Sequence, residues 1–365
     1  MDIYAEIKGI KYSPMNTPKL EEQKFDLFEI NNCSPNCIIS DDKFKFSLSK
    51  WVSPKRTRSY PFERVYNTLG FTKRITVIPI IKDEGKNGDR DFIQWDTISL
   101  MSLLDVYVVL AYYIDAEKHR TRANKITNQK FDNSFVKSKI IEISKYHSSA
   151  LHWNLKEIKE TLPTLIEKVK DNYNTISQKC GVEFHRNDGI EKFKKQFTNG
   201  VNDFMDTSRQ KAKQAQNRER LTFQPKEVLV TESKATITIK NFLGGLYYFT
   251  TDEVRIEDDK IFLIEGKHSK NSKLPSVGDI KDGLLKMILY TNLENLKVND
   301  VKYSYQPVLK LTSENIYGSV SSEDNQDQIN TFFKNNSFNQ NQKDLVASLF
   351  KEGIDNKFLI LIEAV

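Results

Sequence analysis

The feature that most constrains the fold is a pair of apolar-rich runs on either side of a short polar turn. The runs cover residues 246–256 and 261–267, and the turn between them reads Glu257-Asp258-Asp259-Lys260. Two such runs around a polar turn are typical of a β-hairpin. The sequence therefore predicts two antiparallel strands in this part of the chain.

A turn that is symmetric about residues 258 and 259 fixes which side chains oppose one another across the hairpin. It pairs Val254 with Leu263 and Asp252 with Glu265, and directly opposed Cβ atoms lie about 5 Å apart. Lys267 shares the face of Glu265 because side chains alternate along a strand. We therefore expect two carboxylates and one amine on one face, whereas a slip of one residue would turn Asp252 to the other face.

The predicted hairpin offers the ligands of a hard metal ion. Carboxylates held close together repel unless a cation lies between them, and Mg²⁺ binds carboxylate oxygens while it retains several waters. Asp252 and Glu265 would supply the carboxylates, and Gly266 has no side chain to keep its carbonyl from the same ion. Lys267 could orient an attacking water and balance charge in a phosphoryl transition state. The alternative is a surface ion cluster, which contributes little to stability.

A second triplet, Glu84-Gly85-Lys86, is the nearest rival to this site. It follows the apolar run 75–81, but it lies in the segment 82–91, which is rich in glycine, asparagine and aspartate and predicts a loop. It has no obvious partner acid on an adjacent strand. The 265–267 triplet is favoured because it ends an apolar strand and has a matched acid at Asp252.

The wider pattern predicts an α/β protein in three regions. These are an N-terminal α/β region at 1–116, a mainly helical basic section at 117–225 and a C-terminal core at 226–365. Apolar residues at helical spacing predict a helix at 277–296. Further strands are predicted at 75–81, 106–112, 228–230, 235–239, 303–311 and 358–362. A length of 365 residues also favours more than one compact unit.

Composition excludes several classes of protein. With 38% apolar and 28% charged residues, the chain can bury a core and is not disordered as a whole. Three cysteines without a regular framework argue against a disulfide-stapled secreted protein. The first residues show no signal-peptide pattern, and the longest apolar run, 103–114, is too short to span a bilayer. We therefore expect a cytoplasmic protein without a membrane partner.

The pair Thr251-Asp252 and the triplet Glu265-Gly266-Lys267 together resemble the motif of the PD-(D/E)xK nuclease superfamily, with Thr251 in place of the motif's proline. The segments 53–58 and 89–92 also resemble N-terminal parts of bacterial restriction endonucleases. The resemblance implies a restriction-endonuclease-like core, which is a mixed β-sheet flanked by helices. It also implies that Asp252, Glu265 and Lys267 are catalytic, and that Asp252, Glu265 and Gly266 bind Mg²⁺.

The same resemblance implies a type II restriction endonuclease, which hydrolyses phosphodiester bonds of double-stranded DNA at specific sites with Mg²⁺. A homodimer is expected because cutting both strands usually needs two active centres, and a cognate DNA methyltransferase would act on the same DNA sequence. One alternative is a structure-specific repair or recombination nuclease of the same superfamily. Another is a non-catalytic DNA-binding protein whose acidic hairpin is structural. Some members use an additional upstream acid, for which Glu183, Glu191 and Asp203 are candidates.

Three basic segments are candidates for contact with DNA, because lysine and arginine neutralise backbone phosphates. They cover residues 50–58, 118–130 and 209–226, and the net charge of the chain is +6. For each segment taken alone, a solvated surface is the alternative interpretation. The predicted contact residues are Lys55, Arg56, Arg58, Lys211, Lys213, Arg218 and Arg220.

Overall fold

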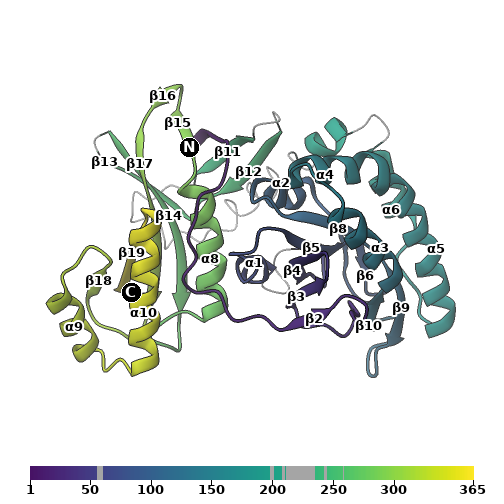
Figure 1. Ribbon diagram of the computed structural model, residues 1–365, viewed down its shortest axis with the longest axis horizontal. Coiled ribbons are helices and arrows are strands. Elements are labelled where there is room, and N and C mark those ends of the chain that lie inside the picture. Colours follow the sequence, from purple (N-terminus) through teal and green to yellow (C-terminus); the bar gives the residue numbers. More distant parts are fainter. Residues whose placement is uncertain (56–60, 198–200, 208–209, 211–234, 242–244, 258) are drawn as a thin grey trace. The chain divides into compact units, whose positions relative to one another are not determined.

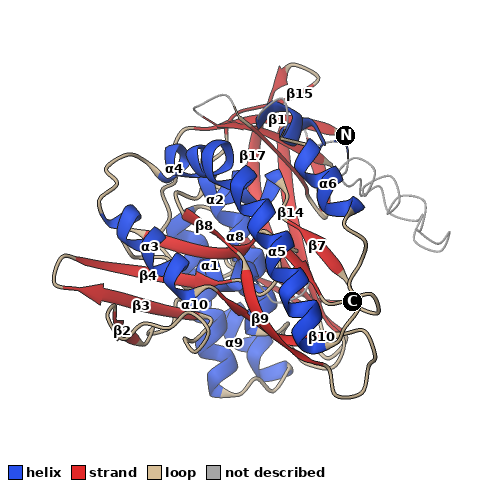
Figure 2. Cartoon of the chain, turned by 90° about the vertical axis from the view of Figure 1, so that its right-hand side faces the viewer, coloured by secondary structure: helices blue, strands red, loops and turns tan. Residues whose placement is uncertain are grey.

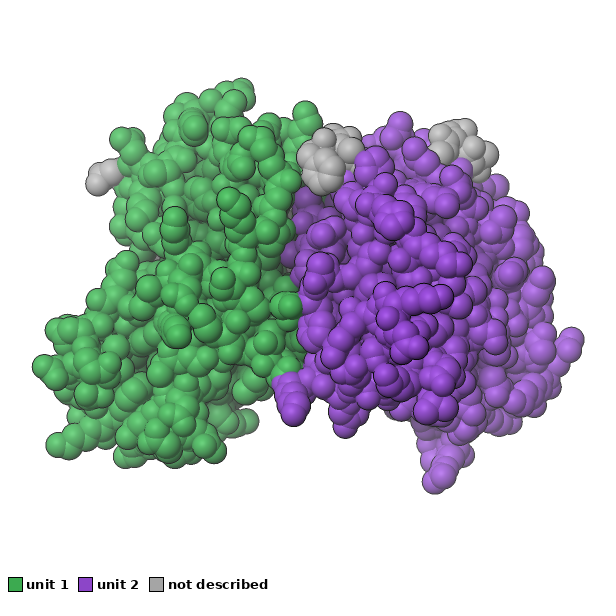
Figure 3. Space-filling view, in the orientation of Figure 1, with its two compact units in different colours: residues 1–18, 65–70, 219–365 green, residues 19–64, 71–218 purple. Residues whose placement is uncertain are grey.

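The chain forms two compact units in the computed structural model, which describes residues 1–55, 61–197, 201–207, 210, 235–241, 245–257 and 259–365. Unit 1 comprises residues 1–18, 65–70 and 219–365, and unit 2 comprises residues 19–64 and 71–218 (Figure 3). The boundary predicted between residues 116 and 117 falls inside a strand of unit 2, β9 (Tyr113–Lys118). The first 18 residues belong with the C-terminal region because their strand pairs with one beyond residue 235.

The first sheet of unit 1 joins the start of the chain to strands that lie between residues 236 and 302. Its strand order is β12-β11-β1-β15-β16, and β1 runs parallel to β11 at its centre. Buried Ile3, Ala5 and Ile7 alternate with more exposed residues along β1, so one face of this strand packs into the core. The bounds are β1 (Asp2–Ile7), β11 (Thr236–Asn241), β12 (Leu246–Thr250), β15 (Glu294–Val298) and β16 (Val301–Lys302).

The second sheet of unit 1 carries the predicted hairpin and has the order β13-β14-β17-β19-β18. Its three inner strands are parallel, and each outer strand is antiparallel to its neighbour. Pairing of Glu265 with Leu309, and of Leu309 with Ile360, puts these three side chains on one face. The bounds are β13 (Glu253–Glu257), β14 (Lys260–Ser269), β17 (Ser304–Ser313), β18 (Ser319–Ser321) and β19 (Leu359–Ala364).

Two helices cover the face of this sheet that carries Glu265. Helix α8 (Val277–Tyr290) packs on β14 and β17, and α10 (Gln340–Asn356) packs on β19 (Figure 1). Gly283 of α8 lies against Leu309, and Gly353 of α10 lies against Ile360, so both helices meet the same face. Helix α9 (Gln326–Asn335) packs beside β18. Side-chain caps start all three helices, at Ser276, Asn325 and Asn339.

Unit 2 is built on a mostly parallel sheet with the order β2-β3-β4-β5-β8, and two hairpins, β6–β7 and β9–β10, accompany it. Its longest described helix, α5, lies alongside β9 (Figure 2). The strand bounds are β2 (Glu22–Lys24), β3 (Asn36–Asp41), β4 (Phe44–Lys50), β5 (Arg74–Pro79), β6 (Ile81–Asp83), β7 (Arg90–Phe92), β8 (Tyr107–Ala111) and β10 (Ile126–Phe131). The helix bounds are α1 (Pro61–Tyr66, shared with unit 1), α2 (Trp95–Leu103), α3 (Asn133–Ser144), α4 (Ala150–Lys156), η2 (Glu157–Thr161), α5 (Leu162–Cys180) and α6 (Asp188–Lys195).

The predicted α/β class is confirmed, and most differences from the predicted elements arise from tertiary pairing. The run 246–256 is not one strand, because β12 joins the first sheet and β13 joins the second. The helix predicted at 277–296 ends at Tyr290, and residues 294–298 pair with β1 as β15. The segment 82–91, predicted as a loop, forms one only at residues 84–89, because its two ends pair with each other in the short strands β6 and β7. The strand predicted at 228–230 lies outside the described residues.

Candidate active site

Asp252 lies at the point where the chain passes from one sheet of unit 1 to the other. The preceding residue, Thr251, is fully buried, and its main-chain N–H donates to the carbonyl of Ala235 at 3.0 Å. This contact fixes the end of β12, so the chain bends at Asp252 before β13 begins. The main-chain N–H of Gly266 donates to Asp252 Oδ2 at 3.1 Å. The Asp252 carboxylate is therefore tied directly to β14, at the residue after Glu265.

The register of the hairpin is the predicted one. Val254 pairs with Leu263 and Ile256 with Ile261, so continuation of the same ladder sets Asp252 opposite Glu265. Asp252 itself precedes the first paired residue of β13, which is Glu253. The Gly266 N–H therefore donates to the Asp252 carboxylate and not to a main-chain carbonyl of β13. The matched pair of acids thus follows from the hairpin, although β13 is shorter than the predicted run 246–256 and β14 is longer than the predicted run 261–267.

Glu265 is a buried carboxylate on a face of β14 that is apolar at the preceding positions and carries Lys267 at the next one. Its side chain has 0% exposure, and its neighbours on that face of β14, Ile261 and Leu263, are also buried. Lys286 of α8 donates to Glu265 Oε2 at 2.7 Å. Glu265 Oε1 accepts no hydrogen bond from the described residues, although the Lys267 ammonium lies 2.9 Å from it. A surface ion cluster, the alternative interpretation of the sequence, does not describe this arrangement.

Lys267 lies between two carboxylates from different elements. Its Nζ is 2.9 Å from Glu265 Oε1 and donates to Asp282 Oδ2 of α8 at 2.8 Å. Gly283 allows this close approach, because a Cβ there would lie 3.3 Å from Lys267 Cε and 2.7 Å from the end of the Leu309 side chain. The lysine side chain is 17% exposed, so its ammonium is held in a defined position with limited access to solvent.

Burial and neighbouring charges oppose each other at this site. Burial raises the pKa of Glu265, and Asp252 raises it further, while Lys286 and Lys267 act to lower it; the net direction is upward. Burial acts to lower the pKa of Lys267, but Glu265 and Asp282 outweigh it and the pKa is raised. Lys267 therefore remains an ammonium at neutral pH, which suits charge stabilisation and excludes a role as a general base in this state.

The donor set fits a magnesium ion that keeps most of its waters. Among the described residues, no group of three or more histidine, cysteine or acidic side chains is arranged to hold a metal. Protein ligands here would be the carboxylates of Asp252 and Glu265, including the Glu265 Oε1 that accepts no hydrogen bond from the described chain. The N–H and C=O of a strand residue point to the same edge, so the Gly266 carbonyl faces the edge where Asp252 lies. Two carboxylates and a carbonyl are adequate for Mg²⁺.

Comparison with protein-family models, with curated proteins and with solved structures finds no match for this chain. Within the part of the chain that the structure describes, no helix is both long enough and apolar enough to cross a membrane.

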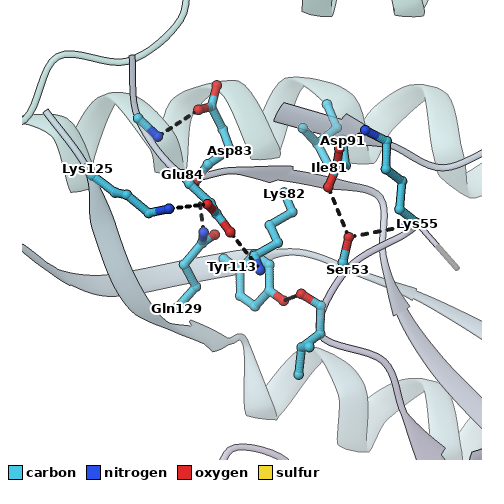
Figure 4. Close-up of polar contacts among 12 residues, drawn as sticks. Ser53, Lys55, Ile81, Lys82, Asp83, Glu84, Asp91, Tyr113, Lys125 and Gln129 are labelled. Carbon is cyan, nitrogen blue, oxygen red and sulfur yellow. Dashed lines mark hydrogen bonds and ion pairs between the residues drawn. The ribbon is translucent and has the colours of Figure 1, made fainter. Parts of the chain in front are cut away.

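The rival triplet does not form a comparable site. Glu84 is in ionic contact with Lys82 at 3.1 Å and with Lys125 at 2.8 Å, as drawn in Figure 4. Lys86 instead pairs with Glu183 at 2.8 Å. Glu84 and Lys86 therefore have separate partners, and the Glu84 network has the character of a structural ion cluster. Burial alone would raise the pKa of Glu84, but hydrogen bonds from Lys125 and Lys82 lower it to about 2.

The candidate additional acids belong to unit 2, as does Lys55. Glu183 pairs with Lys86, and Glu191 pairs with Lys170 at 2.7 Å; Asp203 also lies in unit 2. Lys55 is half-exposed and its Nζ lies 2.6 Å from the buried carboxylate of Asp91, which also accepts from Ser53 Oγ (Figure 4). The other predicted DNA contacts, Arg56, Arg58, Lys211, Lys213, Arg218 and Arg220, lie outside the described residues.

Sequence reasoning missed two members of the site, Asp282 and Lys286. Both come from α8, which packs on the sheet through an apolar stripe. They are spaced i, i+4, so they lie on the same side of the helix. Two charged side chains on a helix that packs against a sheet were the available signal. Their partners could not be identified, because these lie 15 to 21 positions earlier in the sequence.

Proposed function

We propose that this protein is a Mg²⁺-dependent DNA endonuclease of the type II restriction class, with its catalytic centre on the β13–β14 hairpin of unit 1. The proposal includes a restriction-endonuclease-like core, for which the mixed sheet β13-β14-β17-β19-β18 and its covering helices are the candidate. The observation that carries it is the Glu265 carboxylate, which is fully buried beside Asp252 and Lys267.

A structural role explains this carboxylate poorly. Transfer of an ion pair from water into a protein interior costs several kcal/mol per ion, and apolar replacements of such pairs are often neutral or stabilising. The face around Glu265 already contains Leu309 and Ile360, so an apolar residue would suit the packing. Clusters that combine burial with specific charged partners are instead concentrated at functional sites. The geometry of Glu265 and its partners therefore favours a functional role over a structural one.

The proposed chemistry assigns a role to each side chain. Asp252 and Glu265 would hold Mg²⁺, which when bound polarises a phosphodiester and increases the acidity of a coordinated water. Lys267 would face the scissile phosphate and stabilise the negative charge that develops on it. Asp282 would keep the Lys267 ammonium in place, and Lys286 would balance the charge of Glu265. Asp282 is thus proposed as a positioning residue and Lys267 as a catalytic one.

The assembly and the cellular setting follow from the proposed class. Cleavage of both strands of a duplex usually needs two such centres, so we propose a homodimer acting in the cytoplasm. A methyltransferase that modifies the same DNA sequence would protect the host.

Digestion of unmethylated phage DNA by the purified chain, with and without Mg²⁺, tests the proposal. Discrete fragments that require Mg²⁺ are expected, and their ends would define the recognition sequence. A continuous smear would favour the structure-specific nuclease of the same superfamily. No cleavage of several DNAs by a chain that still binds them would favour the non-catalytic DNA-binding protein.

Metal binding can be tested without cleavage. Titration of the chain with Mn²⁺, followed by the relaxation rate of water protons, should detect a bound ion. Asp252→Asn is expected to weaken Mn²⁺ binding, because it removes one of two charged ligands. Asp300→Asn, in the exposed turn between β15 and β16 of the same unit, is a matched control that should leave it unchanged.

A further inference from the structure

The connection between β9 and β10 in unit 2 concentrates positive charge on an exposed turn. Lys118, Arg120 and Arg122 are exposed, and the whole segment 118–130 contains no acidic residue. We refer to these three residues as the basic tip. None of the three forms an ion pair with any residue that the structure describes. The nearest acid along β9, Glu117, accepts a hydrogen bond from Asn128.

The backbone that carries the basic tip is held in a defined conformation. His119 Nδ1 accepts hydrogen bonds from the main-chain N–H groups of Thr121 and Arg122, each at 3.2 Å. The His119 N–H donates to the carbonyl of Lys125 at 2.9 Å, which closes the turn. Asn124 has a positive φ of 48°, a conformation that asparagine tolerates better than most residues. The tip is therefore an organised turn.

A second loop supports the tip from the side. Asn87 donates through its main-chain N–H to the carbonyl of Asn124 at 3.1 Å and through its side chain to that of Ala123 at 3.0 Å. Gly85 makes this contact possible, because a Cβ there would lie 2.4 Å from the Asn124 carbonyl oxygen. Lys125 pairs instead with Glu84, whereas the three tip cations form no ion pair with any residue that the structure describes.

We propose that the basic tip is a contact surface for the phosphate backbone of duplex DNA. Because the turn is already held by hydrogen bonds, its backbone loses little freedom when phosphates replace water around the three cations. Each phosphate that they neutralise releases condensed counterions, which is the main source of affinity for non-specific DNA contacts. The choice of duplex DNA as the partner rests on the proposed function. Binding at the basic tip, however, needs neither Mg²⁺ nor cleavage.

The test is the salt dependence of DNA binding. The full-length chain and the variant Arg120→Gln/Arg122→Gln are titrated onto a fluorescent 30-base-pair duplex in EDTA, over a range of KCl concentrations. Loss of two phosphate contacts should reduce the slope of log K against log salt by about 1.8, since each contact contributes about 0.9. At about 0.1 M salt, the same relation predicts affinity lower by roughly 60-fold.

The control variant is Lys24→Gln/Lys43→Gln, which removes the same net charge from exposed positions of unit 2. It is expected to change the slope far less than the tip variant. A tip variant with the slope and affinity of the control would overturn the proposal, as would a wild-type chain that does not bind duplex DNA in EDTA. A tip effect seen with single-stranded RNA but not with the duplex would also overturn it. A tip effect on the duplex in a chain that never cleaves DNA would support this surface and contradict the proposed nuclease.

Discussion

Replacement of Lys286 with methionine should destabilise unit 1, because it leaves the Glu265 carboxylate buried with one of its two cations. Removal of one partner from a buried ion pair costs about 3–5 kcal/mol. Lys267 remains 2.9 Å from the carboxylate, so we expect the lower end of this range, about 3 kcal/mol. The Glu265→Gln variant removes the buried charge itself. The double variant Lys286→Met/Glu265→Gln should therefore lose about 2 kcal/mol less unfolding free energy than the sum of the losses in the two single variants.

The assay must report on unit 1 alone, because a chain of two units need not unfold in one step. Hydrogen exchange measured by mass spectrometry on peptides from β14 and α8 gives the local opening free energy. Lys302→Met, at an exposed position of β16, is the matched control. It should change the opening free energy of β14 and α8 by less than about 0.5 kcal/mol.

The pH dependence follows from the raised pKa of Glu265, which burial causes in the main. A carboxyl group whose pKa is higher in the folded state than in the unfolded state binds more protons when the chain is folded. The free-energy cost of burying it therefore grows as the pH rises above the pKa of glutamate in the unfolded chain. The Lys286→Met penalty should therefore be larger at pH 8 than at pH 5. Strictly additive single and double variants, or a penalty independent of pH, would refute the interpretation of Glu265 as a buried charge balanced by Lys286.

Three further predictions follow from other contacts. Asp282→Asn should slow DNA cleavage by about tenfold or more with unchanged DNA affinity, because Lys267 loses the carboxylate that positions it; an unchanged single-turnover rate would exclude this role. Gly283→Ala should change unfolding free energy by less than about 1 kcal/mol, since improved helix propensity offsets crowding of Leu309, but it should slow cleavage by displacing Lys267; wild-type cleavage would contradict the packing argument. Glu84→Gln should destabilise unit 2 by about 2 kcal/mol at pH 7. The lowered pKa of Glu84 means that this contribution disappears as pH falls from 4.5 to about 2, so hydrogen exchange of unit 2 should show no difference between wild type and variant at the acid end.

The local part of the site could be predicted from the sequence. The register of the β13–β14 hairpin depends on its turn and on the alternation of apolar residues, and both are visible in a short window. Val254 accordingly pairs with Leu263 as expected. The shared face of Glu265 and Lys267 follows from the two-residue period of a strand.

The non-local part could not be predicted. The break of the run 246–256 at Asp252 depends on β11, whose own partner is β1 at the start of the chain. Periodicity says nothing about pairing across such a separation. The contacts of α8 with the site were missed for a related reason, because apolar spacing shows which side of a helix is buried but not which strand residue a charged side chain meets.

The most direct test of the central claim is cleavage by chains altered at the hairpin. Wild type, Glu265→Gln, Lys267→Ala and the surface control Lys302→Ala are compared on DNA that wild type cuts in Mg²⁺, with DNA affinity in EDTA and hydrogen exchange measured on the same samples. We predict that Glu265→Gln and Lys267→Ala lower the single-turnover rate by about 100-fold or more while they retain DNA affinity and the fold, and that the control cuts normally. Normal cleavage by a folded Lys267→Ala variant would contradict the assignment of the catalytic centre to this hairpin.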